Sequence, residues 1–164
     1  MSAIKLDGYS NFGFFQTLTP QDLTTSAVSG TGIDVRNYQT ATLVVNIGAC
    51  TSAGALSDVD RYQLMIEHGE SDTDGSVYWS ECYPSQMLHS VVGDHTSYSA
   101  LNSGIFQSIA SVTDASALYY VGYRGPKRWL RCRISLVGAP SIFSASAMVV
   151  CSLPCNWPVN DPVN

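Results

Sequence analysis

The residues of this sequence best suited to nucleophilic or metal chemistry are three histidines and five cysteines: His68, His89, His95, Cys50, Cys82, Cys132, Cys151 and Cys155. A catalytic triad needs a serine or cysteine beside a histidine and a carboxylate, but the sequence has neither a GxSxG elbow nor a catalytic cysteine motif. The CxxxC spacing of Cys151 and Cys155 has no nearby histidine or second cysteine pair, so it is a poor zinc signature. We therefore expect no catalytic residue, no metal and no cofactor, and we expect inert thiols rather than a disulfide framework, because the cysteine count is odd and its spacing irregular.

The carboxylates are concentrated in one part of the chain, where seven of the thirteen Asp and Glu residues lie between residues 58 and 81. The segment DTDG, residues 72 to 75, resembles the start of a calcium loop but lacks the further ligands and the closing Glu of an EF-hand. We expect a solvated hairpin loop there. Any two of the thirteen carboxylates could meet as a glycosidase pair, but the sequence marks none out.

The cations are concentrated in another part, because five of the eight Lys and Arg residues lie within YYVGYRGPKRWLRCRISLVG, residues 119 to 138. In a strand over residues 128–138, alternation places Leu130 and Cys132 on one face and Arg131 and Arg133 on the other. We call the cationic set the basic ridge, with Trp129 as its anchor and Tyr123 beside it. Its members are Arg124, Lys127, Arg128, Arg131 and Arg133.

The basic ridge has three interpretations: it follows a nucleic-acid backbone, it docks on an acidic protein surface, or it is a solvent-facing strand that resists edge pairing. A net charge of −5 and a pI near 4.9 give the whole chain no attraction for DNA or an anionic membrane. The acidic hairpin and the basic ridge would supply the two halves of a complementary contact. We therefore favour a protein partner and expect neither direct nucleic-acid nor membrane binding.

Short alternating runs of β-branched and aromatic residues, separated by Gly, Pro, Asp and Ser, indicate an all-β chain. We expect a single-domain antiparallel β-sandwich, of jelly-roll or immunoglobulin-like topology. Strands are expected over residues 40–49, 60–69, 105–110, 117–123, 128–138 and 142–153, with a further strand carrying Tyr78, Trp79 and Tyr83. The run LVVNI in the first of these favours a strand covered on both faces. The last three are expected to be antiparallel and consecutive.

The remaining segments divide the chain. Residues 1–30 are interpreted as an irregular, extended N-terminal arm, residues 31–155 as the β-sandwich domain, and residues 156–164 as a Pro-rich C-terminal tail. Residues 84–104 are expected to be mainly loop. Neither an apolar run long enough to span a membrane nor a signal segment is recognisable, so we expect synthesis and retention in a cytoplasm. Only 13% of the residues are charged, about half the usual share, so much of the surface must be neutral or covered by a neighbour.

Four stretches in succession resemble a group of small head proteins of tailed bacteriophages: GIDVRNYQTATLVVNIGA, IEHGESDTDGSVYW, YYVGYRGPKRWLRCRISLVG and SASAMVVCSLP. In that group an opening D…Y strand, an E.Sddgs.W hairpin and a late vGY.G.kRy.R hairpin recur in this order. The resemblance covers about residues 32–153, and its most specific part is residues 121–131. Residues 84–104 and the Pro-rich tail depart from the pattern.

The resemblance implies a virion structural protein, made in the bacterial host cytoplasm, that decorates or cements the outside of the head. It implies homotrimers that contact the major capsid protein, and we expect the basic ridge, Trp129 and Tyr123 to be the contact residues. A head spike or fibre base and a host-glycan-binding module are the alternatives that remain. A hydrolase within a jelly roll is a third, but no motif supports it.

Overall fold

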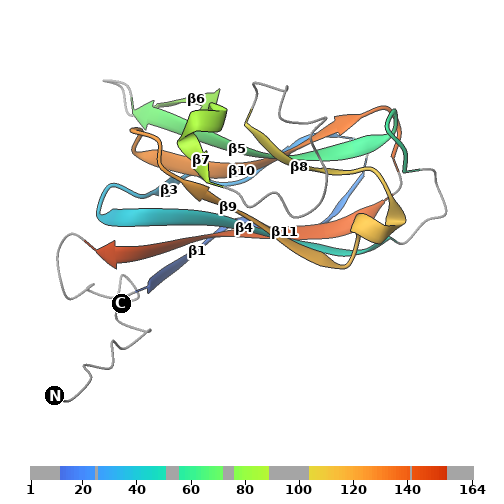
Figure 1. The fold of residues 1–164 in the computed structure, drawn as a ribbon, viewed down its shortest axis with the longest axis horizontal. Helices are drawn as coiled ribbons and strands as arrows, with labels where there is room; N and C mark the ends of the chain where they lie inside the picture. Colours follow the sequence, from blue (N-terminus) through green and yellow to red (C-terminus); the bar gives the residue numbers. More distant parts are fainter. Residues whose placement is uncertain are drawn as a thin grey trace, which may run out of the picture.

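A computed structural model describes residues 12–24, 26–50, 56–71, 76–88, 104–140 and 142–154. This part of the chain folds into two antiparallel β-sheets stacked as two layers, a β-sandwich (Figure 1). It contains no helix long and apolar enough to cross a membrane. The DTDG loop, His89, His95, Cys155, and the outer parts of the expected arm and tail lie outside the described residues.

The first layer, sheet A, has the strand order β1-β11-β4-β9-β7. Its strands are β1 (Phe12–Leu23), β11 (Phe143–Pro154), β4 (Tyr38–Cys50), β9 (Ala117–Tyr123) and the short β7 (Met87–Leu88). Every pairing in this sheet is antiparallel. The first and the last described strands, β1 and β11, lie side by side.

The second layer, sheet B, is built around β10 and β5, which pair over nine residues. Its strands are β2 (Val28–Ser29), β3 (Ile33–Asp34), β10 (Trp129–Val137), β5 (Arg61–Ser71), β6 (Val77–Glu81) and β8 (Ile105–Ile109). Both β2 and β3 pair with one edge of β10, while β6 and β8 pair with β5. The predicted 105–110 strand and the acidic hairpin, β5 with β6, are confirmed, but Tyr83 lies beyond the end of β6.

The core lies between the sheets because inward-facing residues alternate with outward ones along each long strand. On β4, Leu43 and Val45 are fully buried, whereas Val44 is half-buried and Asn46 exposed. The expectation that this strand is covered on both faces is therefore wrong within the single chain. At one end of the core, the Tyr62 ring packs edge-on against Phe143 at 4.7 Å between centroids. The Tyr62 hydroxyl lies 2.8 Å from the Thr24 carbonyl oxygen and so keeps its polar group satisfied.

The interpretation of residues 1–30 as an irregular arm is wrong for β1, which pairs with β11 from Phe12 to Leu23. Pro20 made the segment look like a loop, but proline is tolerated on an edge strand, where its missing N–H has no ladder partner to lose. The register shifts between Leu18 and Gln21, around that proline. Leu18 and Leu23 are buried, so β1 contributes to the core.

The three C-terminal strands are present where predicted, but they are not neighbours of one another. β9 and β11 belong to sheet A, and β10, which lies between them in sequence, belongs to sheet B. The RGPK turn therefore carries the chain from one sheet to the other instead of closing a hairpin. This crossing places the cationic turn at the open end of the sandwich, on the left in Figure 1.

Candidate functional site

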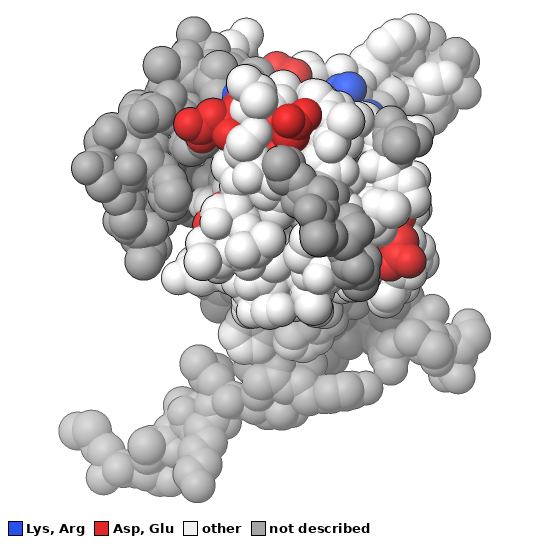
Figure 2. Space-filling model, turned by 90° about the vertical axis from the view of Figure 1, so that its right-hand side faces the viewer, with Lys and Arg blue, Asp and Glu red and all other residues white. Residues whose placement is uncertain are grey.

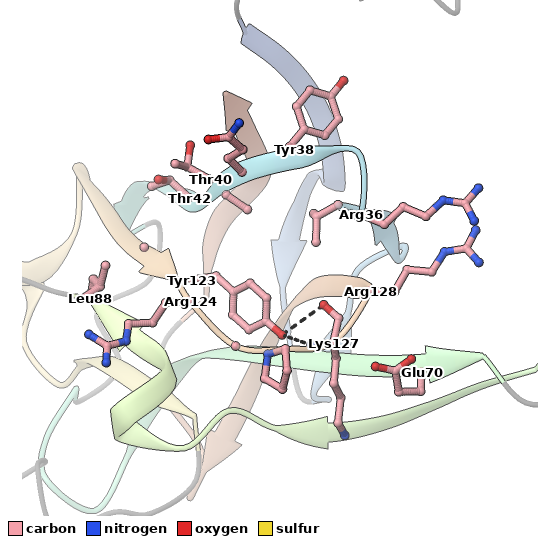
Figure 3. Close-up of a pocket in the computed structure, with 16 residues that line it drawn as sticks. Arg36, Tyr38, Thr40, Thr42, Glu70, Leu88, Tyr123, Arg124, Lys127 and Arg128 are labelled. Carbon is pink, nitrogen blue, oxygen red and sulfur yellow. Dashed lines mark hydrogen bonds between the residues drawn. The ribbon is translucent and has the colours of Figure 1, made fainter. Parts of the chain in front are cut away.

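A cleft of about 690 Å³ opens at the end of the sandwich where the chain crosses from β9 to β10. Its cationic lining comes from two turns: Arg36 precedes β4, and Arg124, Lys127 and Arg128 belong to the crossing turn. Glu70 is the carboxylate among the lining residues (Figure 3). Figure 3 also shows Arg36 and Arg128 side by side, with Arg124 on the opposite side of Tyr123.

The crossing turn is held in place by Tyr123, which is buried at the end of β9. Its hydroxyl accepts a hydrogen bond from the backbone N–H of Lys127 at 3.0 Å and lies 2.9 Å from Nδ1 of the buried His68. Burial raises the pKa of Tyr123 to about 12. Burial, aided by the charge of Lys127, lowers the pKa of His68. Both rings are therefore neutral at pH 7, and Tyr123, which we expected to be a contact residue, positions the turn and lines the cleft.

Arg128 is engaged within the chain. Its Nε and Nη2 donate to Oδ2 of Asp34 at 3.0 and 2.7 Å, and Arg36 lies 3.3 Å from the same oxygen. Partial burial opposes ionisation of Asp34, but the hydrogen bonds and charges of the two arginines outweigh it and lower the pKa of this carboxyl. Asp34 lies on β3 directly opposite Trp129 of β10. The ion pair between Asp34 and Arg128 therefore fastens the β3 edge to β10.

Arg131 and Arg133 share the carboxylate of Glu67, which lies opposite Arg131 on β5. Arg131 Nε donates to Oε2 at 2.6 Å, and Arg133 Nη1 donates to Oε1 at 2.9 Å. Glu67 is 3% exposed. Glu67 of β5 thus meets its polar partners inside the same molecule, and one of the two positive charges in this half of the basic ridge is balanced.

Trp79 completes this cluster on the outer side of sheet B. Its ring stacks on the Arg131 guanidinium, 4.2 Å from the ring centroid. The indole lies directly over Gly69 and Gly32, which have no side chains. A Cβ added at Gly69 would lie 3.3 Å from the ring and one added at Gly32 would lie 2.7 Å from it, which is too close in the second case. Trp129, the predicted anchor, donates its Nε1–H to Ser71 at 2.7 Å and lies beneath Arg128. Both indoles are half-buried and act mainly as cover for sheet B.

The basic ridge therefore separates into two parts. Arg131 and Arg133 are tied to Glu67, while the turn residues face the cleft. Arg124 is exposed and forms no ion pair with a carboxylate of the described chain, and Lys127 donates to the Ser80 hydroxyl at 2.6 Å. Glu67 of the acidic hairpin pairs with the ridge, so part of the complementary contact expected between molecules is made within one molecule.

The opposite end of the sandwich is acidic. Asp22 lies near the end of β1, Asp58 and Asp60 precede β5, and Asp114 precedes β9. Arg61 is the one Lys or Arg at this end in the described ranges. Figure 2 looks onto this end and shows several acidic groups with little blue between them. The described part of the molecule is thus polarised along its strands, with a cationic cleft end and an acidic end.

A third surface was missed by sequence reasoning. The outward side of sheet A, between the rows of Phe12 and Leu118, carries no Asp, Glu, Lys or Arg in the residues described, and we call it the neutral face. Large apolar side chains stand exposed on it: Phe12, Phe14, Leu88, Leu118, Tyr120 and Met148. The signal in the sequence was the low share of charged residues.

Elsewhere, burial raises the pKa of the Cys82, Cys132 and Cys151 thiols to about 12, which makes them poor nucleophiles. No group of three or more His, Cys, Asp or Glu side chains within the described ranges is placed to hold a metal ion. The cleft offers cations and hydroxyls, and such a lining suits the docking of an anionic group.

No model of a known protein family matches this chain, and no curated protein has a similar sequence.

Proposed function

We propose that this protein is a non-enzymatic virion component, a decoration or cement protein that binds the outside of a tailed-phage head and stabilises the lattice of the major capsid protein. The cationic cleft end carries this proposal. Arg36, Arg124 and Lys127 line it from two turns, and Glu70 is the one carboxylate among the described lining residues. A rigid cationic end on an otherwise acidic molecule selects an acidic surface in one orientation, which suits binding to a repeating array.

Binding to an assembled lattice stabilises it by mass action, because a ligand that binds the assembled state and not the free subunits shifts the equilibrium toward assembly. Several copies held together multiply this effect through avidity. The resemblance to head proteins implies three copies over local threefold axes, and that number is part of the proposal.

The sheet orders support a jelly-roll topology over an immunoglobulin-like one. If β2 with β3 and β6 with β8 are each counted as one strand, the chain has eight strands besides β7. The first then pairs with the eighth, the second with the seventh, the third with the sixth and the fourth with the fifth. Such a folded-over series of pairs is the jelly-roll arrangement, which occurs in viral capsid proteins and in lectins. This support is analogy at the level of the fold.

The test uses heads assembled from the phage's own major capsid protein without this chain. Arg124→Glu lowers the net charge by two at the cleft, and a matched double variant, Val112→Glu with Thr113→Glu, lowers it by two at the acidic end, where both residues are exposed. We expect Arg124→Glu to weaken head binding about tenfold or more and the matched variant to bind like the wild type, since about 1.4 kcal/mol corresponds to tenfold.

If the two variants bind heads equally well, the cleft does not contact the head. If the wild-type chain does not bind heads, the proposal is refuted.

Glycan binding is the second candidate, supported by the exposed rings of Tyr78 and Tyr83 near the same end. Exposed aromatic side chains provide the flat apolar surfaces on which sugars stack. A glycan array separates the candidates, because a cement protein alone predicts no hits.

A further inference from the structure

We propose that the neutral face is where this protein associates with itself, by packing against the neutral face of a second copy whose strands run in the opposite direction. This inference concerns contact between copies and does not depend on head binding.

Side chains of similar height extend across the neutral face in rows set by the strand register. In one row Gln16 lies opposite Met148, Met148 opposite Val44, and Val44 opposite Tyr120. Tyr120 is 56% exposed and Met148 43% exposed. Thr42, Asn46 and Gln16 also stand on this face, so it is neutral and not wholly apolar, but a monomeric protein seldom leaves so many large apolar side chains together open to water.

The neutral face is large enough for a stable dimer. Strands lie about 4.8 Å apart and rise about 3.4 Å per residue, so its Cα positions span about 20 Å in each direction. Side-chain margins enlarge this area to roughly 700 Å², close to the about 800 Å² that each partner contributes to a standard interface. Crystal-packing contacts mostly bury less than about 800 Å² over both partners, whereas two neutral faces would bury roughly 1,400 Å².

Charge identifies the second copy as the occupant. Two copies with a net charge of −5 repel each other over most of their surface, but the neutral face brings no charged pair together. When the strands of the two copies run in opposite directions, the cationic cleft end of each lies over the acidic end of the other. Attraction at both ends then offsets the overall repulsion and fixes the orientation.

The other route to self-association, edge-to-edge pairing through β1, is disfavoured by the chain itself. Pro20 lacks an N–H for a new ladder, and the two register shifts between Gln16 and Gln21 bend the strand. Sheet-on-sheet packing therefore remains the geometry that fits the exposed side of sheet A.

The first experiment measures the mass of the full chain by sedimentation equilibrium over micromolar concentrations, without capsids. The variant Tyr120→Glu with Met148→Glu places two charges on the neutral face. The matched control, Tyr78→Glu with Tyr83→Glu, places two charges at equally large exposed side chains outside it, which are 65% and 62% exposed. We expect two copies for the wild type and, with a dissociation constant raised only the several-fold that added charge near the cleft end explains, for the control. The neutral-face variant should be a single copy, with the dissociation constant raised about a hundredfold or more.

A wild-type mass of one or three copies overturns the inference, and so does a neutral-face variant that keeps the wild-type mass. Circular dichroism and thermal unfolding establish that each variant is folded. If the charged variant fails to fold, Tyr120→Ser with Met148→Ser takes its place under the same criterion.

The orientation has its own test at low salt, where screening is weak. With the copies antiparallel, Arg124→Glu faces an acidic end and weakens the dimer several-fold, and adding Asp58→Lys to the same chain restores it. With the copies parallel, Arg124→Glu relieves repulsion between like ends and tightens the dimer. Tightening, or no change, overturns the antiparallel arrangement.

Discussion

Glu67 is the residue on which the outer side of sheet B depends, since one buried carboxylate pairs with both Arg131 and Arg133 and balances one of their two charges. Removing one member of a buried ion pair costs about 3–5 kcal/mol because the remaining charge is left without a partner. Here the arginines are 20% and 38% exposed, so water compensates in part. We expect Glu67→Gln to lower the free energy of unfolding by about 1–3 kcal/mol in urea titrations.

Glu81 offers the matched control, because it lies directly opposite Glu67 on β6 and is exposed. Glu81→Gln should change stability by less than about 0.5 kcal/mol. Equal effects of the two substitutions would show that the shared carboxylate contributes no more than an ordinary surface charge.

His68 gives the fold a dependence on pH. Its pKa is held below the ordinary value by burial and by the nearby Lys127, although Glu70 acts in the opposite direction. Because the folded pKa is depressed, the stabilisation is fully present above the unfolded value and is lost as pH falls below about 6.5. We therefore expect the free energy of unfolding to decrease between about pH 6.5 and pH 5.

The variant His68→Gln isolates this effect, because His89 and His95 are present in both proteins. Urea titrations at a series of pH values should show a weaker dependence in the variant than in the wild type. An NMR titration in which the His68 ring protonates at or above its usual pH would contradict the burial argument.

At the scale of elements, β1 determines whether the N-terminal segment belongs to the core. Leu23 is fully buried at the end of β1, whereas Leu153 on the neighbouring β11 is half exposed. Leu23→Ala should lower the free energy of unfolding by about 2–5 kcal/mol, because it removes apolar contacts and leaves a cavity. Leu153→Ala should cost less than about 1 kcal/mol. If urea titrations gave the same midpoint for both, β1 would be the loosely attached arm that the sequence suggested.

The sequence was informative about where strands lie and uninformative about which strands pair. Alternation along β4, β5 and β10 reports local periodicity, which a strand keeps in any sheet. The RGPK turn has the residues of a hairpin, but its φ and ψ preferences do not distinguish a turn within one sheet from a turn between two. β1 was missed because Pro20 and Asp22 are common in turns. An edge strand also tolerates them, but the sequence does not show which strand is an edge.

The candidate site was predicted in part. Clustering along the chain identified Arg124, Lys127 and Arg128, since residues of one turn stay together in any fold. The partners of the basic ridge come from distant segments: Asp34 of β3 pairs with Arg128, Ser80 of β6 with Lys127, and Glu67 of β5 with Arg131 and Arg133. No local pattern identifies such partners, so the pairing of Arg131 and Arg133 with Glu67 could not be foreseen.

The whole molecule assigns different surfaces to different tasks. The head proposal uses the cleft end, and the dimer proposal uses the neutral face, with the cleft end fixing the orientation of the two copies. Arg124→Glu tests head binding, and the Tyr120 and Met148 substitutions test self-association in solution. A dimer in solution removes the threefold copy number from the first proposal and leaves its head contact standing, and failure to bind heads leaves the dimer standing. The share of charged residues is unusually low for a globular protein, and the described surface that lacks them is the outward side of sheet A.

The pairing of β1 with β11 also bears on how the chain is made. On a ribosome, Phe12–Leu23 emerges long before its partner Phe143–Pro154. Because β11 lies between β1 and β4, both strands wait with unsatisfied edges until β11 has been made. A nascent chain in this state depends on chaperones or on rapid synthesis to avoid aggregation, and its folding is slow because its contacts join distant segments.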